Sequence, residues 1–164
     1  MIGEALLAYV ILERLAELVI SSRNTKALKA RGAVEAGAGH YLVMVVLHVS
    51  WLVAVTSWVG FTHSQANPIF VAAYVLVQLL RIWVMASLGR YWTTRIISLP
   101  DAPLVAGGPY KFLRHPNYVV VTLEVAILPL VYGAYPIAVV FSLLNAAMLY
   151  VRIRAENAAL SARR

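Results

Sequence analysis

The stretch GGPYKFLRHPNYVVVTLE, residues 107–124, sets the most polar and most constrained loop of the chain directly against an apolar run. Lys111, Arg114 and His115 lie close together in it, and Pro109 and Pro116 flank them. Upstream, residues 90–106 add further prolines and show no sustained helical period. We therefore interpret residues 90–117 as an irregular loop at the edge of a lipid-facing region.

The rest of the composition indicates a membrane protein. Of the 164 residues 62% are hydrophobic and only 13% are charged, and the mean hydropathy is +0.77. A soluble domain carries about 25% charged residues. The absence of cysteine excludes disulfides and thiolate metal sites. The N-terminal segment contains three glutamates and no basic leader, which is not typical of a cleaved signal peptide.

Apolar runs divide the chain into spans. Three reach the roughly 20 residues that a membrane helix needs, and two are shorter. The runs are 3–21, 41–61, 68–88, 118–132 and 136–151. As a helix, 118–132 is only about 22 Å long against a hydrocarbon core of about 30 Å, so it would draw the preceding loop into the membrane. Irregular backbone at that depth must be covered by protein or line a cavity, and we expect the loop to line one.

The net charge of +7 follows the loops. Lys and Arg gather in 23–31, in 90–114 and after 151, whereas the connections 62–67 and 133–136 contain none. This is the positive-inside pattern, and it explains the charge without a nucleic-acid partner. It places the C-terminus and the loops 22–40 and 90–117 in the cytoplasm.

These observations predict an all-α integral membrane protein of about five transmembrane helices, N-terminus outside. Residues 1–164 would form a single membrane domain. Residues 1–89 would supply three spans, and 90–164 a catalytic loop, a helical hairpin and a C-terminal helix. Asn67-Pro68 is a typical helix start, with Asn as the cap.

Familiar catalytic motifs are absent. The sequence contains no phosphate loop, no dinucleotide-binding glycine turn, no His-Glu-x-x-His and no serine nucleophile elbow. The four histidines, at 40, 48, 63 and 115, have no metal-ligand spacing, so we expect no metal.

Polar residues inside the apolar runs are candidates for chemistry. Asn145, Arg152 and Glu156 share one face of the last helix, although Arg152 and Glu156 could form an ordinary i, i+4 ion pair. Glu124 lies about two turns into its span, where an ionisable group is costly unless it is paired. It could act in catalysis or form an ion pair with Arg81; both interpretations stay open.

The pentapeptide RHPNY, residues 114–118, also has two interpretations. It could simply start a helix, with Pro116 in the first turn and Tyr118 at the membrane interface. Alternatively it could bind a ligand, because the Gly-Gly-Pro turn before it exposes backbone groups and because a histidine and basic side chains converge at one depth.

The segments LVAGGPYKFLRHPNY (104–118) and NAAMLYVRIRAEN (145–157) resemble the C-terminal half of the isoprenylcysteine carboxyl methyltransferase family. The family pattern is Gly-Pro-Tyr, Arg-His-Pro-x-Tyr, a helical hairpin and Arg-Ile-x-x-Glu-Glu. The resemblance covers roughly residues 88–160. One departure is visible, because Asn157 stands where the family has a second glutamate.

The resemblance implies a membrane methyltransferase that uses S-adenosylmethionine, releases S-adenosylhomocysteine and resides in a bacterial inner membrane. The cofactor-binding residues that it implies are Leu104, Val105, Gly108, Tyr110, Arg114, His115, Pro116, Tyr118, Glu156 and Asn157. The catalytic candidates are Arg152, Glu156 and Glu124. The methyl acceptor would be a lipidic molecule that enters the site from the surrounding membrane lipid. It would be either a prenylated carboxylate or a hydroxyl of an alkyl-chain small molecule.

Three other functions are open at this point. Phospholipid N-methyltransferases share this cofactor half. Membrane sterol reductases carry a similar Arg-His-Pro-x-Tyr but are much longer than this chain. A non-enzymatic membrane scaffold would bind no cofactor.

Overall fold

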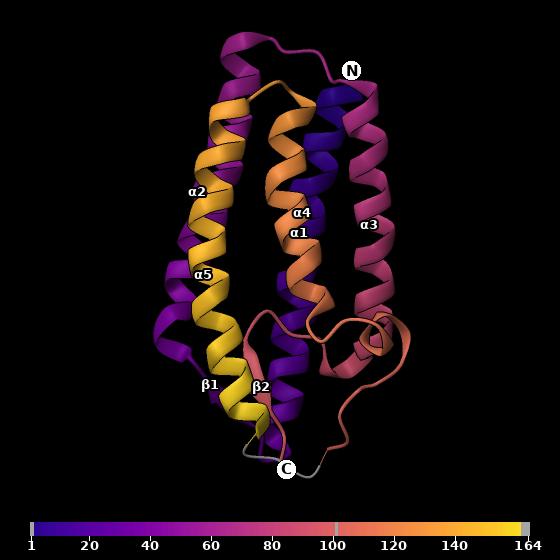
Figure 1. Ribbon diagram of the computed structural model, residues 1–164, viewed down its shortest axis with the longest axis vertical. Coiled ribbons are helices and arrows are strands. Elements are labelled where there is room, and N and C mark those ends of the chain that lie inside the picture. The colour runs from indigo at the N-terminus through magenta and orange to yellow at the C-terminus, as the bar shows by residue number, and fades with distance from the viewer. Residues whose placement is uncertain (1, 101, 162–164) are drawn as a thin grey trace.

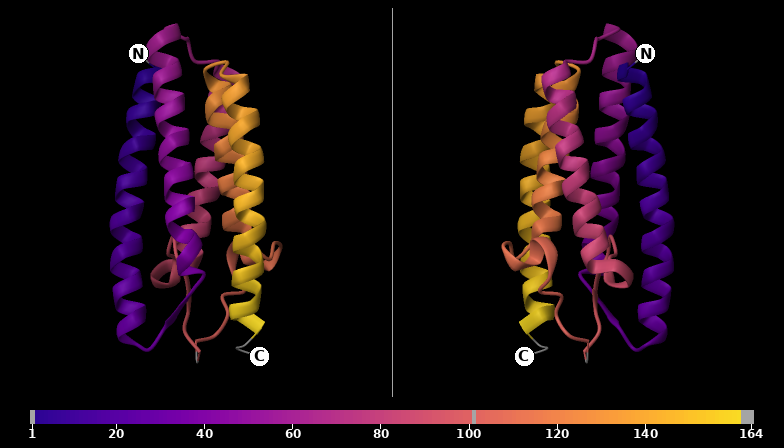
Figure 2. Two further views of the ribbon diagram at one scale, coloured as in Figure 1. Left: turned by 90° about the vertical axis from the view of Figure 1, so that its left-hand side faces the viewer. Right: turned by 90° about the vertical axis from the view of Figure 1, so that its right-hand side faces the viewer.

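The computed structural model describes residues 2–100 and 102–161. Five long helices run alternately up and down the bundle in Figure 1, with the N-terminus at one end and the C-terminus at the other. They are α1 (Ile2–Ala30), α2 (Ala38–Thr62), α3 (Pro68–Leu88), α4 (Pro116–Val131) and α5 (Tyr135–Ser161). The two views of Figure 2 place α1 at one edge of the bundle. The prediction of an all-α chain is confirmed.

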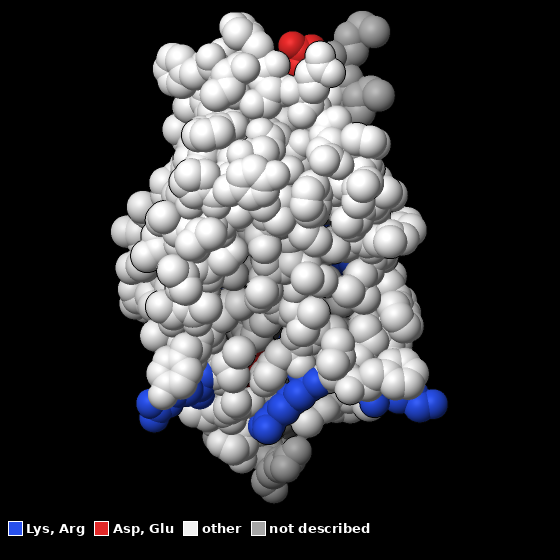
Figure 3. Space-filling model, turned by 45° about the horizontal axis from the view of Figure 1, so that its top comes forward, with Lys and Arg blue, Asp and Glu red and all other residues white. Residues whose placement is uncertain are grey.

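The helices fit a bilayer. Ala38–Thr62, Pro68–Tyr91 and Tyr135–Ser161 are long and apolar enough to cross it, and α4 is a shorter apolar helix. Helix α1 is long enough but carries Glu13, Arg14 and Glu17 in its middle. The face seen in Figure 3 is almost free of charged side chains except at its lower end, where Lys and Arg gather. The chain is an integral membrane protein.

One predicted boundary is wrong. Residues 22–30 were expected to belong to a cytoplasmic loop, but α1 continues through them to Ala30. Leu28 is buried, and the Asn24 side-chain amide donates to the backbone carbonyl of Trp92 at 2.7 Å. These tertiary contacts hold the basic segment as helix.

The loop after α3 is irregular, as predicted, yet it contains short ordered pieces. A 3-10 turn covers Gly89–Tyr91, a second one, η2, covers Gly108–Lys111, and between them lies strand β2 (Ile96–Ser98). Strand β2 pairs antiparallel with β1 (Val34–Ala36). This two-stranded ribbon was not predicted, because three-residue strands leave too little periodicity to recognise.

Helix α3 begins as its sequence indicates. The Asn67 side chain accepts a hydrogen bond from the backbone N–H of Ile69 at 3.0 Å, and Pro68 takes the first helical position. The cap satisfies an otherwise free N–H and fixes where α3 starts.

Helix α4 occupies the centre of the bundle. Its Val120, Leu128 and Val131 are fully buried, and its backbone carbonyl at Val125 accepts a hydrogen bond from the Trp51 indole at 3.2 Å. Because α4 is held on several sides, its N-terminal end is a fixed platform for the loop that precedes it.

Buried charges join α1, α3 and α4 in the middle of the bundle. Arg81 donates to Glu124 at 2.6 Å and to Glu17, and Arg14 donates to Glu124 at 2.9 Å. We call Glu13, Arg14, Glu17, Arg81 and Glu124 the ion-pair cluster. It confirms the pairing of Glu124 with Arg81 and shows that the charges in the middle of α1 face protein.

Candidate functional site

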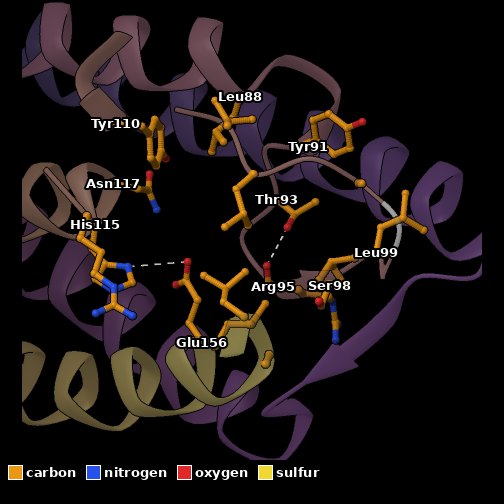
Figure 4. A pocket seen from close by; sticks show the side chains of 18 of the residues that line it. Leu88, Tyr91, Thr93, Arg95, Ser98, Leu99, Tyr110, His115, Asn117 and Glu156 are labelled. Atoms are coloured by element: carbon orange, nitrogen blue, oxygen red, sulfur yellow. Dashed lines mark hydrogen bonds and ion pairs between the residues drawn. The ribbon is translucent and has the colours of Figure 1, made fainter. Parts of the chain in front are cut away.

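A cavity of about 400 Å³ lies at the lower end of the molecule, among the end of α3, the loop 90–115, the start of α4 and the end of α5. This volume falls in the range of about 300–1,000 Å³ typical of small-molecule sites. Figure 4 shows Tyr110, His115, Asn117 and Glu156 around a common opening, with Leu88 and Leu99 on its apolar sides.

The cavity gathers most of the predicted site residues. Those that line it are Leu104, Val105, Tyr110, Arg114, His115, Tyr118, Arg152 and Glu156. Gly108, Pro116 and Asn157 do not line the cavity, but each lies within two residues of one that does. Pro116 is buried at the first turn of α4, and Asn157 is hydrogen-bonded to His115.

Gly108 contributes by its backbone conformation. Its φ of +58° favours glycine, and a Cβ there would lie 2.1 Å from the Ser87 hydroxyl oxygen on α3. The residue therefore lets the turn η2 approach α3 closely. This contact positions Tyr110, two residues further on, at the cavity wall.

Glu156 is the centre of the polar side. The Tyr118 hydroxyl donates to Glu156 Oε2 at 2.5 Å, and His115 Nδ1 lies 3.7 Å from Oε1. His115 Nε2 donates to Asn157 Oδ1 at 3.1 Å, because an amide oxygen can only accept. Tyr118 and His115 thus fix the orientation of the Glu156 carboxylate, which can still accept hydrogen bonds from a ligand in the cavity.

The same contacts change the pKa of His115. The neighbouring Glu156 carboxylate raises the pKa of the imidazole above its ordinary value, and the Asn157 hydrogen bond acts in the same direction, against the effect of burial. Burial also raises the pKa of Tyr110, so this hydroxyl stays protonated and can donate.

This raised pKa predicts a pH-dependent stability. The protonated imidazole stabilises the folded state. This contribution is fully present below the ordinary histidine pKa of about 6.5 and is lost as the pH rises through the raised pKa. We expect the thermal midpoint of the wild type to exceed that of His115→Gln most clearly at acidic pH and to approach it at alkaline pH. Melting curves over a pH series measure this difference. The exposed His63, replaced by Gln, is the control; a difference independent of pH at position 115 would contradict the ion pair.

Arg152 does not form the surface ion pair with Glu156 that was one interpretation. Its side chain is buried, it donates to the backbone carbonyl of Thr94 at 2.9 Å, and its guanidinium lies 5.9 Å from the centre of the Tyr118 ring. Arg152 thus ties α5 to the loop and still lines the cavity. Asn145, on the same helix face, is fully buried.

Glu124 lies outside the cavity. All its hydrogen bonds that involve described residues go to the ion-pair cluster and to Gln78, whose amide donates to it at 2.9 Å. The structure therefore favours the structural interpretation of this residue over the catalytic one.

Sequence reasoning missed the contribution of the strand β2 region. Thr93, Arg95 and Ser98 line the cavity, and Arg95 donates to Glu35 of β1 at 2.5 Å. The only signal in the sequence was a basic residue in the loop. The pairing that brings it to the cavity joins segments about sixty residues apart and has no local signature.

Comparisons with known proteins found a matching family model and relatives of this chain. Residues 69–162 match the model of the isoprenylcysteine carboxyl methyltransferase family. The chain is 40% identical over 158 residues to the uncharacterized protein YpbQ of Bacillus subtilis strain 168, with 94% of each chain covered. It is 28% identical over 152 residues to an uncharacterized protein of Haemophilus influenzae, with 90% of this chain and 88% of that protein covered. No solved structure matches.

Proposed function

Because the chain belongs to the isoprenylcysteine carboxyl methyltransferase family, we propose that it transfers a methyl group from S-adenosylmethionine to an oxygen atom of a lipidic acceptor. The observation that carries the proposal is the cavity in which Tyr118 and His115 fix Glu156 beside an apolar loop wall. The basic residues at this end of the bundle support a cytoplasmic location for the site, in a bacterial inner membrane.

The residues present suit such a cofactor. Glu156 can accept from an ammonium group or from ribose hydroxyls, and Asn117 and Tyr110 add hydrogen-bonding groups. Apolar side chains, among them Leu88 and Leu104, offer a surface for a flat ring. In this proposal His115, Tyr118, Glu156 and the backbone of 104–110 hold the cofactor, and Arg114 and Asn157 support them.

S-adenosylmethionine supplies an electrophilic methyl carbon bound to a sulfonium sulfur. In the reaction the acceptor oxygen forms a bond to this carbon, the carbon–sulfur bond breaks, and S-adenosylhomocysteine is released. The protein's part is mainly to align acceptor and methyl group. A carboxylate acceptor needs no base, and Arg152 could orient it. A hydroxyl acceptor would pass its proton to a base, for which Glu156 or His115 is placed at the cavity.

Calorimetry with S-adenosylhomocysteine tests the cofactor assignment on the detergent-purified protein. We expect measurable binding by the wild type and at least a tenfold loss, about 1.4 kcal/mol, in Glu156→Ala and in His115→Ala. Glu4→Gln, in the first turn of α1 and outside the cavity lining, serves as the control and should bind like the wild type. Absence of binding by the folded wild type would overturn the proposal.

Acceptor analogues then separate the acceptor classes. Turnover would be measured with alkyl-chain compounds that carry a carboxylate, a hydroxyl or an amine. Methylation of the amine alone would replace the O-methyltransferase by an N-methyltransferase, and cofactor binding without turnover on any class would argue for a different acceptor chemistry.

A further inference from the structure

A second cavity, of about 480 Å³, lies between the lower half of α1, the start of α2 and the loop before β2. Its lining is basic and rich in hydroxyl groups. The residues are Leu18, Ser21, Ser22, Thr25, Lys26, Lys29, Tyr41 and Arg95. None of them carries a negative charge, so the cavity favours an anion.

Nearby acidic groups do not neutralise this charge. Glu35 is shared by Lys29 at 2.6 Å and Arg95 at 2.5 Å, and both cations hold the pKa of its carboxyl below the usual value. Lys26 has no partner among the described residues, and the buried Thr25 hydroxyl has none either. The cavity therefore has three cations, Lys26, Lys29 and Arg95, and only one nearby carboxylate, that of Glu35. The Lys26 ammonium and the Thr25 hydroxyl remain free to donate to a ligand.

The surroundings of the cavity are lipid-facing. On α1, Leu15 and Val19 are exposed, and on α2, Leu42 and Val43 are exposed close to the start of the helix. Leu18 joins this apolar surface to the cavity lining. A ligand that fits both parts has an anionic head and hydrocarbon chains.

We propose that this cavity binds the phosphate headgroup of an anionic membrane phospholipid, whose acyl chains lie along the exposed apolar side chains of α1 and α2. Lysine, arginine and hydroxyl groups are the usual partners of phosphate oxygens, and basic residues at the membrane surface attract anionic lipids. The unpartnered Lys26 and Thr25 would supply contacts that no protein group now uses.

A polar wall separates this site from the candidate active site. The Ser21 and Tyr41 hydroxyls lie 2.8 Å and 3.1 Å from the hydroxyl oxygen of Thr94, whose carbonyl accepts from Arg152. Arg95 lines both cavities, and its guanidinium lies 3.8 Å from the centre of the Tyr41 ring. Apart from Arg95 the two cavities share no lining residue, so lipid binding can be tested separately from the proposed methyltransferase activity.

Lipid binding by the purified protein tests the proposal directly. Native mass spectrometry would compare the retention of phosphatidylglycerol and phosphatidylcholine by the wild type, Lys26→Gln and Arg23→Gln. We expect preference for phosphatidylglycerol, and a loss of affinity of about fivefold or more in Lys26→Gln. Arg23 is an exposed cation on the same helix that does not line the cavity, so Arg23→Gln should change the affinity much less.

Three results would overturn the proposal. Equal losses in the two variants would indicate general charge attraction, and equal retention of the two lipids would exclude selection of an anionic headgroup. Retention of inorganic phosphate without retention of phosphatidylglycerol would point to a free anion as the ligand. Circular dichroism of each variant establishes that the compared proteins are folded.

Discussion

Replacing Arg81 with methionine is expected to lower the free energy of unfolding by about 3 to 5 kcal/mol. Arg81 is buried and donates both to Glu17, through Nη2 at 2.8 Å, and to Glu124, through Nη1 at 2.6 Å. Methionine fills similar space but leaves two buried carboxylates short of positive charge, far from bulk water. Titration with a denaturing detergent in mixed micelles, followed by circular dichroism, measures the change.

Two further variants separate charge from packing. In Arg81→Met with Glu17→Leu a cation and a carboxylate are removed together, while Glu124 keeps Arg14 as a partner, so part of the loss should be recovered. Arg90→Met removes an exposed cation and should cost little. If the double variant were as unstable as the single one, the loss would arise from packing and not from uncompensated charge.

The sequence indicated the helices well because lipid imposes a simple requirement. Long apolar runs must be helical in a bilayer, so five helices could be predicted. The side of the membrane that the basic residues indicate stays a prediction. The end of α1 could not, because residues 22–30 are polar and are held as helix by tertiary contacts such as that of Asn24 with the loop.

The ion-pair cluster and the two-stranded ribbon of β1 and β2 depend on contacts between distant segments, which local sequence patterns do not reveal. The cost of a lone charge in lipid was enough to suggest that Arg81 and Glu124 meet. It could not show that Glu17 and Arg14 complete the cluster, because this depends on how α1 rotates against α3 and α4. The pairing of β1 with β2, which brings Arg95 to both cavities, is equally nonlocal.

The candidate site was predicted mainly through the family resemblance. The bundle brings His115, Tyr118 and Glu156 together, although α4 and α5 place them about forty residues apart in sequence. Sequence spacing suggested that Glu156 pairs with Arg152. In the structure Glu156 accepts a hydrogen bond from Tyr118, and Arg152 donates to the backbone of Thr94 in the loop. Helical periodicity gives the face of a residue but not its partner on another element.

Replacing Gly108 with alanine is expected to destabilise the protein by about 2 to 5 kcal/mol, from a left-handed backbone and from overpacking. The new Cβ would lie 2.1 Å from Ser87 Oγ and 3.0 Å from Ser87 Cβ, so η2 must move away from α3. Tyr110 moves with it, and binding of S-adenosylhomocysteine should weaken as well. The same detergent titration and calorimetry measure the two effects.

The neighbouring glycine provides a matched control. Gly107 has a φ of −91°, which any residue adopts, and a Cβ there would meet no atom within 4 Å. Gly107→Ala should therefore leave stability within a few tenths of a kcal/mol of the wild type. Adding Ser87→Ala to Gly108→Ala removes the closest oxygen but not the backbone strain, so it should restore part of the stability. Equal effects of the two glycine substitutions would mean that both glycines act through the flexibility of the loop. The close contact of Gly108 with α3 would then not be what positions Tyr110.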